Sequence, residues 1–240
     1  MLLTDTEIEI AEKALAFAKN NRTRICRRLT DINMFPPEES PVSVFMSGSP
    51  GAGKTETSKE LVSSLAQDQG GVLRLDPDDL RTEFDEYNGS NSYLFQKAIS
   101  VLIERALDYV FRNNQSFLLD GTLSSYGVAE KNIQRSINKE RAVLIIFVYQ
   151  RPELAWQFVK AREKLEGRRI LPEHFIDQFF GSQLVVDVLK EKFADKIQVD
   201  LLIKDNDGLT ASYQSNIDRL KPCLKTHYTR DELVDIVRKL

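Results

Sequence analysis

The sequence contains few of the residues that build metal centres and disulfide frameworks. Its 240 residues include two cysteines and two histidines. Cys26 and Cys223 lie far apart and match no metal-binding or redox spacing, and two histidines argue against a zinc site. We therefore expect a reduced chain without a zinc centre.

Long apolar runs and a secretion signal are also lacking. No apolar run approaches the roughly 20 residues that a helix needs to span a bilayer. The first residues, MLLTDTEIEIAEKAL, carry acidic side chains where a signal peptide needs a positive segment followed by an apolar one. These absences predict a soluble, cytoplasmic protein that does not contact membranes.

A strong charge of either sign is missing as well. The formal net charge is -3, which gives no global attraction to nucleic acid or to anionic lipid. Hydrophobic residues make up 42% and charged residues 29% of the chain, as is ordinary for globular proteins. The length permits one large α/β domain or two small ones.

Apolar runs alternate with helical stretches after residue 42. Strands are expected at 42–46, 71–76, 116–122, 142–150 and, more weakly, 197–205. Helices are expected at 53–67, 92–112 and 127–138, between 152 and 193, and from Thr229 onward. Strands separated by helices predict an α/β fold, with a mostly parallel sheet and helices on both faces.

The first thirty residues form a separate helical pattern. Apolar residues repeat at helical spacing from 5 to 31, and the proline-rich segment MFPPEESP at 34–41 ends any helix. We expect an N-terminal helical extension at 1–33 and a main domain at 42–240.

The segment GSPGAGKT at 48–55 fits the pattern G-x-x-x-x-G-K-[ST]. Its glycines let successive N–H groups point at a triphosphate, and the N-terminus of the following helix favours an anion. In such loops the lysine, here Lys54, reaches the β- and γ-phosphates, and the hydroxyl of Thr55 binds Mg²⁺. The alternative is a coincidental glycine-rich turn. The predicted nucleotide-binding residues are Gly48, Ser49, Pro50, Gly51, Ala52, Gly53, Lys54, Thr55 and Glu56.

A phosphate-binding loop does not by itself distinguish a kinase from a GTPase or a motor. The sequence has no N-K-x-D motif for reading guanine, and polynucleotide motors are usually longer. We therefore favour a P-loop NTPase fold of the small-molecule kinase type. Such an enzyme needs a base beside the acceptor hydroxyl and arginines on a mobile lid.

The stretch RLDPDDLR carries Asp76, Asp78 and Asp79 at the end of an expected strand. Ligands gather at the carboxyl ends of parallel strands, so a carboxylate there could accept a proton from an attacking hydroxyl. For any one of these aspartates taken alone, capping of the next helix is the favoured alternative.

Two later stretches fit the same chemistry. In SFLLDGT, Asp120 stands where a strand-end acidic residue supports Mg²⁺, although Asp-Gly is also a common turn pair. In AREKLEGRRILPEHF, Arg162, Arg168 and Arg169 could clasp phosphates, although a solvated, salt-bridged helix end is the alternative.

Together, these stretches resemble the zeta toxins of bacterial toxin–antitoxin systems. The likeness extends from Val44 to Asp205 and is carried by GSPGAGKT, LDPDDLR, LLDGTL and RPELAWQFVKAREKLEGRRILPEHF. Zeta toxins are P-loop kinases that phosphorylate UDP-N-acetylglucosamine and related activated amino sugars. The resemblance implies ATP and Mg²⁺ as cofactors, a nucleotide sugar as acceptor and an antitoxin protein as a possible partner.

The resemblance also assigns roles to individual residues. It implies that Asp78 is the catalytic base and that Arg162 and Arg169 are the lid arginines, the latter because of its spacing from Pro172. The metal ligands, Thr55 and Asp120, are those expected of P-loop proteins in general. The acceptor-binding positions that the resemblance implies are Glu104, Asp120, Thr122 and Asn132.

One departure from the family concerns the acceptor pocket. The family often has an arginine two residues after its G-T, where this chain has Ser124. The sequence therefore specifies the reaction better than the substrate. Another acceptor (a nucleotide cofactor, an antibiotic or a polynucleotide 5′ end) and a nucleotide-binding module without catalysis are the alternatives.

The N-terminal helix leaves two hypotheses open. In the related toxins an antitoxin covers the ATP site with a helix, so residues 5–31 could dock beside the P-loop and restrain the kinase in cis. Alternatively, the helix extends the core.

Overall fold

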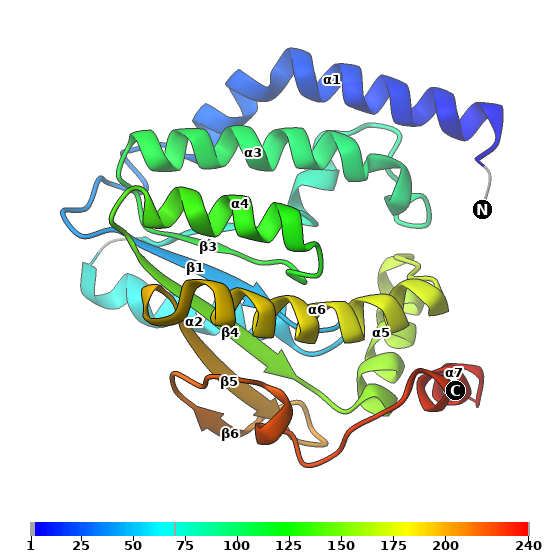
Figure 1. Cartoon of the computed structure of the whole chain (residues 1–240). Coiled ribbons are helices and arrows are strands. Elements are labelled where there is room, and N and C mark those ends of the chain that lie inside the picture. Colours follow the sequence, from blue (N-terminus) through cyan, green and yellow to red (C-terminus); the bar gives the residue numbers. More distant parts are fainter. Residues whose placement is uncertain (1–2, 70, 240) are drawn as a thin grey trace.

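The computed structural model describes residues 3–69 and 71–239, which form an α/β fold (Figure 1). The strands are β1 (Val42–Ser47), β2 (Leu73–Leu75), β3 (Phe117–Leu119), β4 (Ala142–Tyr149), β5 (Gln198–Lys204) and β6 (Thr210–Gln214). The helices are α1 (Asp5–Leu29), α2 (Lys54–Gln69), α3 (Gln96–Arg112), α4 (Tyr126–Ile137), α5 (Pro152–Glu166), α6 (Pro172–Phe193) and α7 (Arg230–Lys239). Short 3₁₀ turns are η1 (Asp79–Glu83), η2 (Ser92–Phe95), η3 (Ala194–Lys196) and η4 (Lys221–Cys223). Within this described part, no helix has the length and apolarity required to cross a bilayer.

The sheet has the strand order β2-β3-β1-β4-β5-β6. Strands β2 to β5 are joined through parallel ladders, and only the edge pair of β5 with β6 is antiparallel among the described strands. This confirms the predicted α/β class and mostly parallel sheet. Strand β6 was not expected, because its residues TASYQ are almost all exposed and show no apolar alternation.

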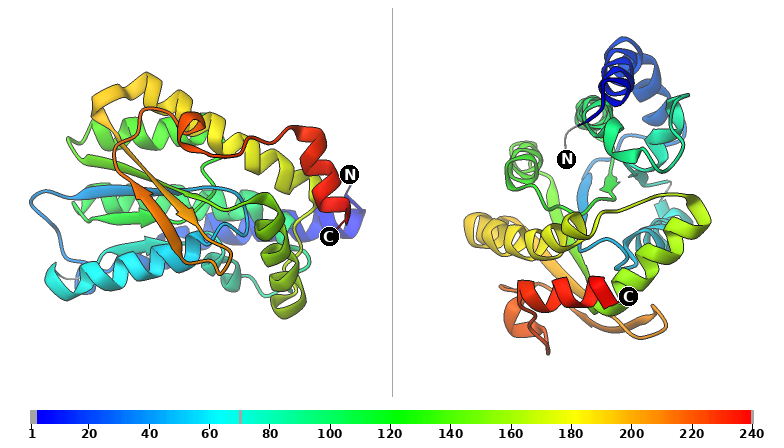
Figure 2. Two further views of the ribbon diagram at one scale, coloured as in Figure 1. Left: turned by 90° about the horizontal axis from the view of Figure 1, so that it is seen from below. Right: turned by 90° about the vertical axis from the view of Figure 1, so that its right-hand side faces the viewer.

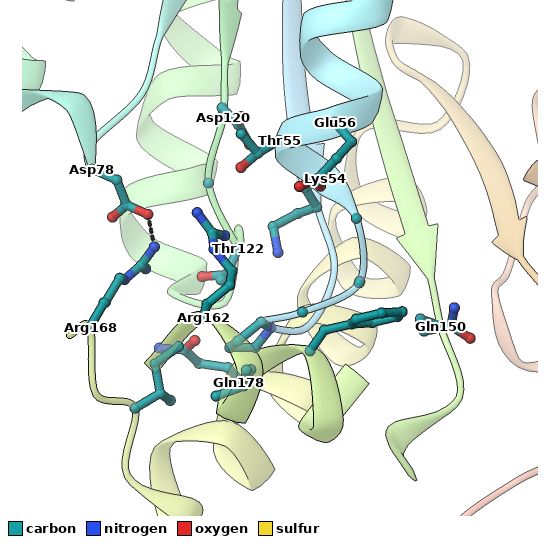
Figure 3. A pocket seen from close by; sticks show the side chains of 18 of the residues that line it. Lys54, Thr55, Glu56, Asp78, Asp120, Thr122, Gln150, Arg162, Arg168 and Gln178 are labelled. Carbon is teal, nitrogen blue, oxygen red and sulfur yellow. Dashed lines mark hydrogen bonds and ion pairs between the residues drawn. The ribbon is translucent and has the colours of Figure 1, made fainter. Parts of the chain in front are cut away.

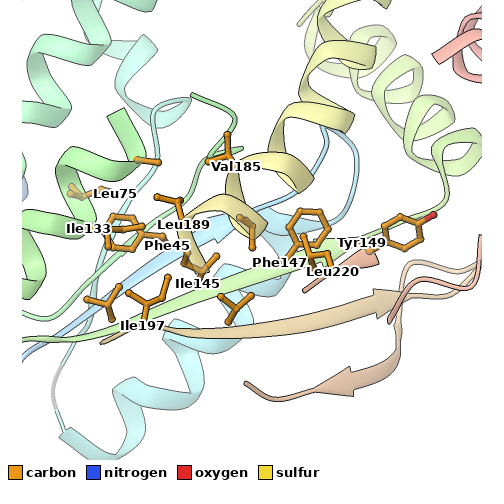
Figure 4. Packing of buried hydrophobic residues seen from close by; sticks show 14 of the residues in the cluster. Phe45, Leu75, Ile133, Ile145, Phe147, Tyr149, Val185, Leu189, Ile197 and Leu220 are labelled. Carbon is orange, nitrogen blue, oxygen red and sulfur yellow. The ribbon is translucent and has the colours of Figure 1, made fainter. Parts of the chain in front are cut away.

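Helices cover both faces of the sheet because the central strands are apolar on both sides. Phe45 of β1 and Phe147 of β4 pack toward α4 and α6 in the main core cluster (Figure 4). Their neighbours Val44 and Met46 face the other way, in a smaller cluster to which α2 contributes. The Phe45 and Phe117 rings meet edge to face with centroids 5.5 Å apart.

The N-terminal helix α1 lies along α3, outside the helices that cover the sheet (Figures 1 and 2). It begins with a capping box in which the Thr4 hydroxyl accepts from the Glu7 amide and the Glu7 carboxylate accepts from the Thr4 amide. Its buried face is small, with Ala14 and Ala18 allowing close approach to α3. The helix predicted at 5–31 is therefore present and packs onto the domain.

Two glycines of the loop after β1 are required by close backbone contacts. Gly48 has φ +134°, and a Cβ there would lie 2.2 Å from the carbonyl oxygen of Val148. Gly51 has φ +72°, and a Cβ there would lie 2.1 Å from the carbonyl oxygen of Ala155. The loop can approach β4 and α5 this closely only because neither position has a side chain.

We expect Phe45→Ala to lower the free energy of unfolding by about 3–5 kcal/mol, because the ring is fully buried and its removal leaves a cavity. Urea denaturation monitored by circular dichroism measures this loss. The control is Val128→Ala on α4, where the side chain is 60% exposed and the expected change is within about 0.5 kcal/mol. Equal effects of the two substitutions would contradict the described core.

Candidate active site

A cavity of about 470 Å³ opens at the carboxyl edge of the parallel sheet (Figure 3). Its walls come from the segments that follow β1, β2, β3, β4 and β5, together with residues of α5 and α6. The topology explains this convergence, because parallel strands all end at the same edge. Within the cavity the structure brings together most of the residues expected to act on phosphate.

The phosphate-binding loop forms one wall. Residues 50–56 line the cavity, and α2 begins at Lys54, so that its first N–H groups face inward. Gly48 and Ser49 lie behind the loop, where their carbonyl oxygens accept hydrogen bonds from the Lys54 ammonium at 3.0 and 2.7 Å. Of the predicted nucleotide-binding residues, these two therefore shape the loop and do not line the cavity.

Burial lowers the pKa of Lys54 to about 8, because removal from water disfavours the charged ammonium. The negative charge of Asp120 acts in the opposite direction, whereas Arg168 and Arg162 lower the pKa further. Burial is the largest of these influences and weakens the hold of Lys54 on its proton. An anion placed beside the ammonium would reverse this effect.

Two buried carboxylates at the ends of β2 and β3 are tied together by Arg74. Its guanidinium forms ion pairs with Asp76 and with Asp120, the latter at 2.6 Å. The hydroxyl of Ser58 donates to Asp120 at 2.7 Å and accepts from Nε of Arg74 at 2.9 Å. Burial raises the pKa of Asp76 to about 6, with the charge of Asp78 acting in the same direction. Arg74 is not among the predicted site residues, although a single charge within the strand LRL is a sign of a residue facing a polar partner.

Asp78 is fixed by its backbone and by two arginines. Its amide donates to Asp76 at 2.7 Å, which holds the turn after β2. Its Oδ1 pairs with Arg81. Its Oδ2 pairs with Arg168, which lies in the turn between α5 and α6 that we call the lid turn (Figure 3). Both carboxylate oxygens are therefore engaged. Nε of Arg81 is buried without a hydrogen-bond partner among the described residues.

The turn after α5 places Arg168 at the cavity and the predicted Arg169 outside it. Helix α5 ends at Gly167, which has φ +70° and reverses the chain direction. Arg168, immediately after it, lines the cavity, whereas the side chain of Arg169 is 64% exposed and lies 3.8 Å from Glu163. Successive side chains of an extended segment point to opposite sides, so one arginine of the pair faces inward and the other outward.

Other predicted residues divide between the cavity and the helices around it. Arg162, Asp120 and Thr122 line the cavity, together with Thr55.

Glu104 on α3 does not line the cavity, and it pairs with Lys131 of α4 on the surface. Asn132 on α4 is 4% exposed and also lies outside the cavity. Neither Glu104 nor Asn132, which were expected to bind an acceptor, lines the cavity, since spacing along a helix does not fix which side faces a ligand. Their role in acceptor binding stays a prediction. Ser124 bonds the Thr122 hydroxyl at 3.0 Å.

Several residues that line the cavity are not among the predicted ones. Gln150 directly follows β4, and Asp207 and Gly208 follow β5, so the strand-end rule could have found them. Phe158 on α5 and Gln178 on α6 gave no such signal, because a single residue in a helical pattern does not reveal its neighbours.

The oxygen donors of the cavity fit Mg²⁺. Among the described residues no three His, Cys, Asp or Glu side chains cluster as a metal site. Mg²⁺ at phosphate sites needs fewer, because it keeps several waters and takes its other ligands from one or two carboxylates and the phosphates. A hydroxyl from Thr55 and a carboxylate from Asp120 supply that donor set.

We expect Arg74→Leu to destabilise the protein by about 3–5 kcal/mol at pH 7.5, because it leaves Asp76 and Asp120 buried without their partner. A carboxyl whose pKa is raised in the folded state costs stability when ionised, and the cost falls as pH drops through that pKa. The loss should therefore be smaller at pH 5 than at pH 7.5. Urea denaturation at both pH values measures it; Arg74→Lys, which keeps a charge, should lose less. A loss independent of pH would contradict the buried ion-pair network.

Comparisons with known proteins agree with this geometry. The sequence profile of the Zeta toxin family matches residues 26–218. No curated protein matches the sequence. Among solved structures, the chain is similar to a protein of the PezAT chromosomal toxin–antitoxin system of Streptococcus pneumoniae, with a TM-score of 0.63 and 18% identity over 99% of this chain and 96% of that chain.

Two further structures share the fold at lower similarity. One is a chain of the AvrRxo1-ORF1:ORF2 complex with ATP, with a TM-score of 0.58 and 18% identity over 86% of this chain and 65% of that chain. The other is a chain of the Pnkp1/Rnl/Hen1 RNA repair complex, with a TM-score of 0.51 and 14% identity over 81% of this chain and 54% of that chain. Identities this low establish the fold alone. The family profile, which covers most of the sequence, establishes more: this chain belongs to the zeta toxin family and has its P-loop kinase fold.

Proposed function

We propose that this protein transfers the γ-phosphoryl group of ATP to a hydroxyl of a small acceptor, with a UDP-N-acetylglucosamine-type nucleotide sugar as the first candidate. The observation that carries the proposal is the cavity itself. A phosphate-binding loop with Lys54, a carboxylate from Asp78 and the lid guanidiniums of Arg162 and Arg168 line one space. Membership in the family supports the reaction, and a complex of related fold is known with ATP.

The triphosphate would bind along residues 50–55. Main-chain N–H groups at the start of α2 would hold the β-phosphate, and the ammonium of Lys54 would exchange its carbonyl partners for phosphate oxygens. Thr55 and Asp120 would hold Mg²⁺, whose charge offsets that of the phosphates during transfer.

Asp78 would accept the proton of the attacking hydroxyl. The acceptor oxygen forms a bond to the γ-phosphorus, the bond from that phosphorus to the bridging oxygen breaks, and ADP leaves with the electron pair. The charges in the cavity suggest how the base becomes free: the γ-phosphate competes with Oδ2 of Asp78 for Arg168. Arg81 then still holds Oδ1 and keeps the carboxylate in place.

The acceptor would occupy the rest of the cavity. Neutral amides from Gln96 and Gln178 and the hydroxyl of Thr122 line it, and such groups suit the hydroxyls of a sugar. Ser124, at the position where the family often has an arginine, leaves the acceptor's own phosphates with fewer cationic partners. The nucleotide-sugar assignment therefore rests on the family, and the transfer reaction on the residues described above.

The acceptor can be identified by incubating the protein with ATP, magnesium and a metabolite extract, and by finding the compound that gains a phosphate in mass spectrometry. We expect a nucleotide sugar. Phosphate on a nucleotide cofactor, an antibiotic or an RNA 5′ end would keep the reaction and replace the acceptor. ATP binding without acceptor-dependent ADP release would instead indicate a regulatory module.

Asp78→Asn should retain ATP binding and lower acceptor-dependent transfer by at least about 10², because the amide cannot accept the proton. Isothermal titration with ATP and a coupled ADP assay separate the two effects. Near-normal transfer by this variant would exclude Asp78 as the base. In the matched variant Lys54→Ala, binding and turnover should both fall.

ATP binding at pH 8 should take up protons, because Lys54 has a pKa of about 8 and the triphosphate stabilises its charged form. Because bound ATP raises the pKa of Lys54, the affinity for ATP weakens as the pH rises above 8. Calorimetry in buffers of different ionisation enthalpy measures the uptake. Lys54→Met should lose this component of the uptake; an unchanged value would assign it to another group.

A further inference from the structure

The segment between β2 and α3 carries the proposed base, yet it has little regular structure. It consists of the short turns η1 and η2 with loops between them, and no residue from 76 to 95 pairs in the sheet. Its position must therefore come from side-chain packing. We propose that α1 positions this segment, which we call the Asp78 segment (residues 76–95), and so is a working part of the active site. The inference deepens the proposed function and rests on it for its effect on transfer.

Apolar packing joins α1 to the Asp78 segment in a cluster separate from those around the sheet. From α1 it contains the buried residues Ala14, Ala18 and Ile25, and from the segment Leu80, Phe84, Leu94 and Phe95. The rings of Phe17 and Phe84 meet edge to face with centroids 5.6 Å apart, and those of Phe84 and Phe95 lie 5.2 Å apart. Much of the apolar burial of the segment therefore depends on α1, together with the first turns of α3.

Polar contacts attach the segment near both ends of the helix. Arg28, in the last turn of α1, pairs with Glu83 of η1. The hydroxyl of Tyr93 in η2 donates to the Glu7 carboxylate in the first turn. Exposed contacts of this kind add little stability, but two of them, far apart along one helix, fix its register against the segment.

The same segment touches the lid. Gly89 has φ +86°, and a Cβ there would lie 2.9 Å from the carbonyl oxygen of Glu166 at the end of α5. The next residues are Gly167 and Arg168, which pairs with Asp78. Helix α1 thus supports the loop against which the lid turn rests, as well as the turn that carries the base.

The residues that line the cavity distinguish two possible roles of α1, which are support of the Asp78 segment and inhibition of the kinase. None of the described residues of α1 lines the cavity, and the helix lies beyond α3 (Figure 2). This placement contradicts the hypothesis that residues 5–31 dock beside the P-loop and restrain the kinase in cis. The alternative that the helix extends the core agrees with the packing. In this position the helix also supports the segment that carries Asp78.

Phe17→Ala in the full chain tests the inference. Displacing a catalytic group by 1 Å costs up to about 10², so we expect acceptor-dependent transfer to fall by about ten- to a hundredfold. The ATP dissociation constant should stay within about twofold, because the apolar cluster that contains Phe17 includes no residue of β1 or α2. Amide hydrogen exchange should accelerate at residues 78–95 and stay unchanged in β1 and α2. Phe17→Leu should behave in between, and Glu12→Ala on the exposed side of α1 should match the wild type.

A charge reversal provides a second variant that does not open the core. Arg28→Glu places a second carboxylate beside that of Glu83 and should accelerate amide hydrogen exchange at residues 79–84. The double variant, with Glu83→Arg added, should restore the wild-type rate of exchange. Unchanged exchange in the segment for both Phe17→Ala and Arg28→Glu would overturn the inference, as would equal acceleration throughout the chain. Failure of the wild type to phosphorylate any acceptor would refute the proposed function alone, because the exchange measurement does not depend on activity.

Discussion

A buried guanidinium between two carboxylates holds the centre of this protein together. Asp76 and Asp120 end neighbouring parallel strands, and like charges placed so close in a poorly solvated site would repel each other. Arg74 lies between them and satisfies both, with Ser58 from α2 as a third partner. The turn that carries Asp78 and the phosphate-binding helix are therefore fixed to the same ion-pair network.

From this centre the charges alternate outward across the cavity. The negative charges of Asp120 and Asp78 act on the Lys54 ammonium, and the positive charges of Arg81 and Arg168 pair with Asp78. Such an arrangement keeps each group near its partner before a substrate arrives, so that little reorganisation is needed when phosphates enter. It also links the lid turn to the proposed base through a single guanidinium, that of Arg168.

Packing contacts outside the sheet determine the position of Asp78. The sheet ladder ends at Leu75, and the following segment depends on an apolar cluster built largely with α1 and the start of α3. A kinase of this kind needs its base fixed while its lid moves. A long helix held by small residues and an aromatic contact supplies a rigid support, and the Gly89 loop conveys that support to the lid turn.

The sequence by itself determined the parts whose conformation is local. The phosphate loop, the alternating strands and helices and the strand-end positions of Asp78 and Asp120 could all be predicted, because glycine freedom, periodicity and parallel topology act over short stretches. Tertiary structure decided the rest. It turned Arg168 inward and Arg169 outward, directed Glu104 toward α4 and buried Asn132, and added an exposed edge strand that no apolar pattern indicated. It also gave α1 its place against the Asp78 segment. These outcomes depend on contacts between residues far apart in the chain, and periodicity cannot reveal which distant surface a side chain will meet.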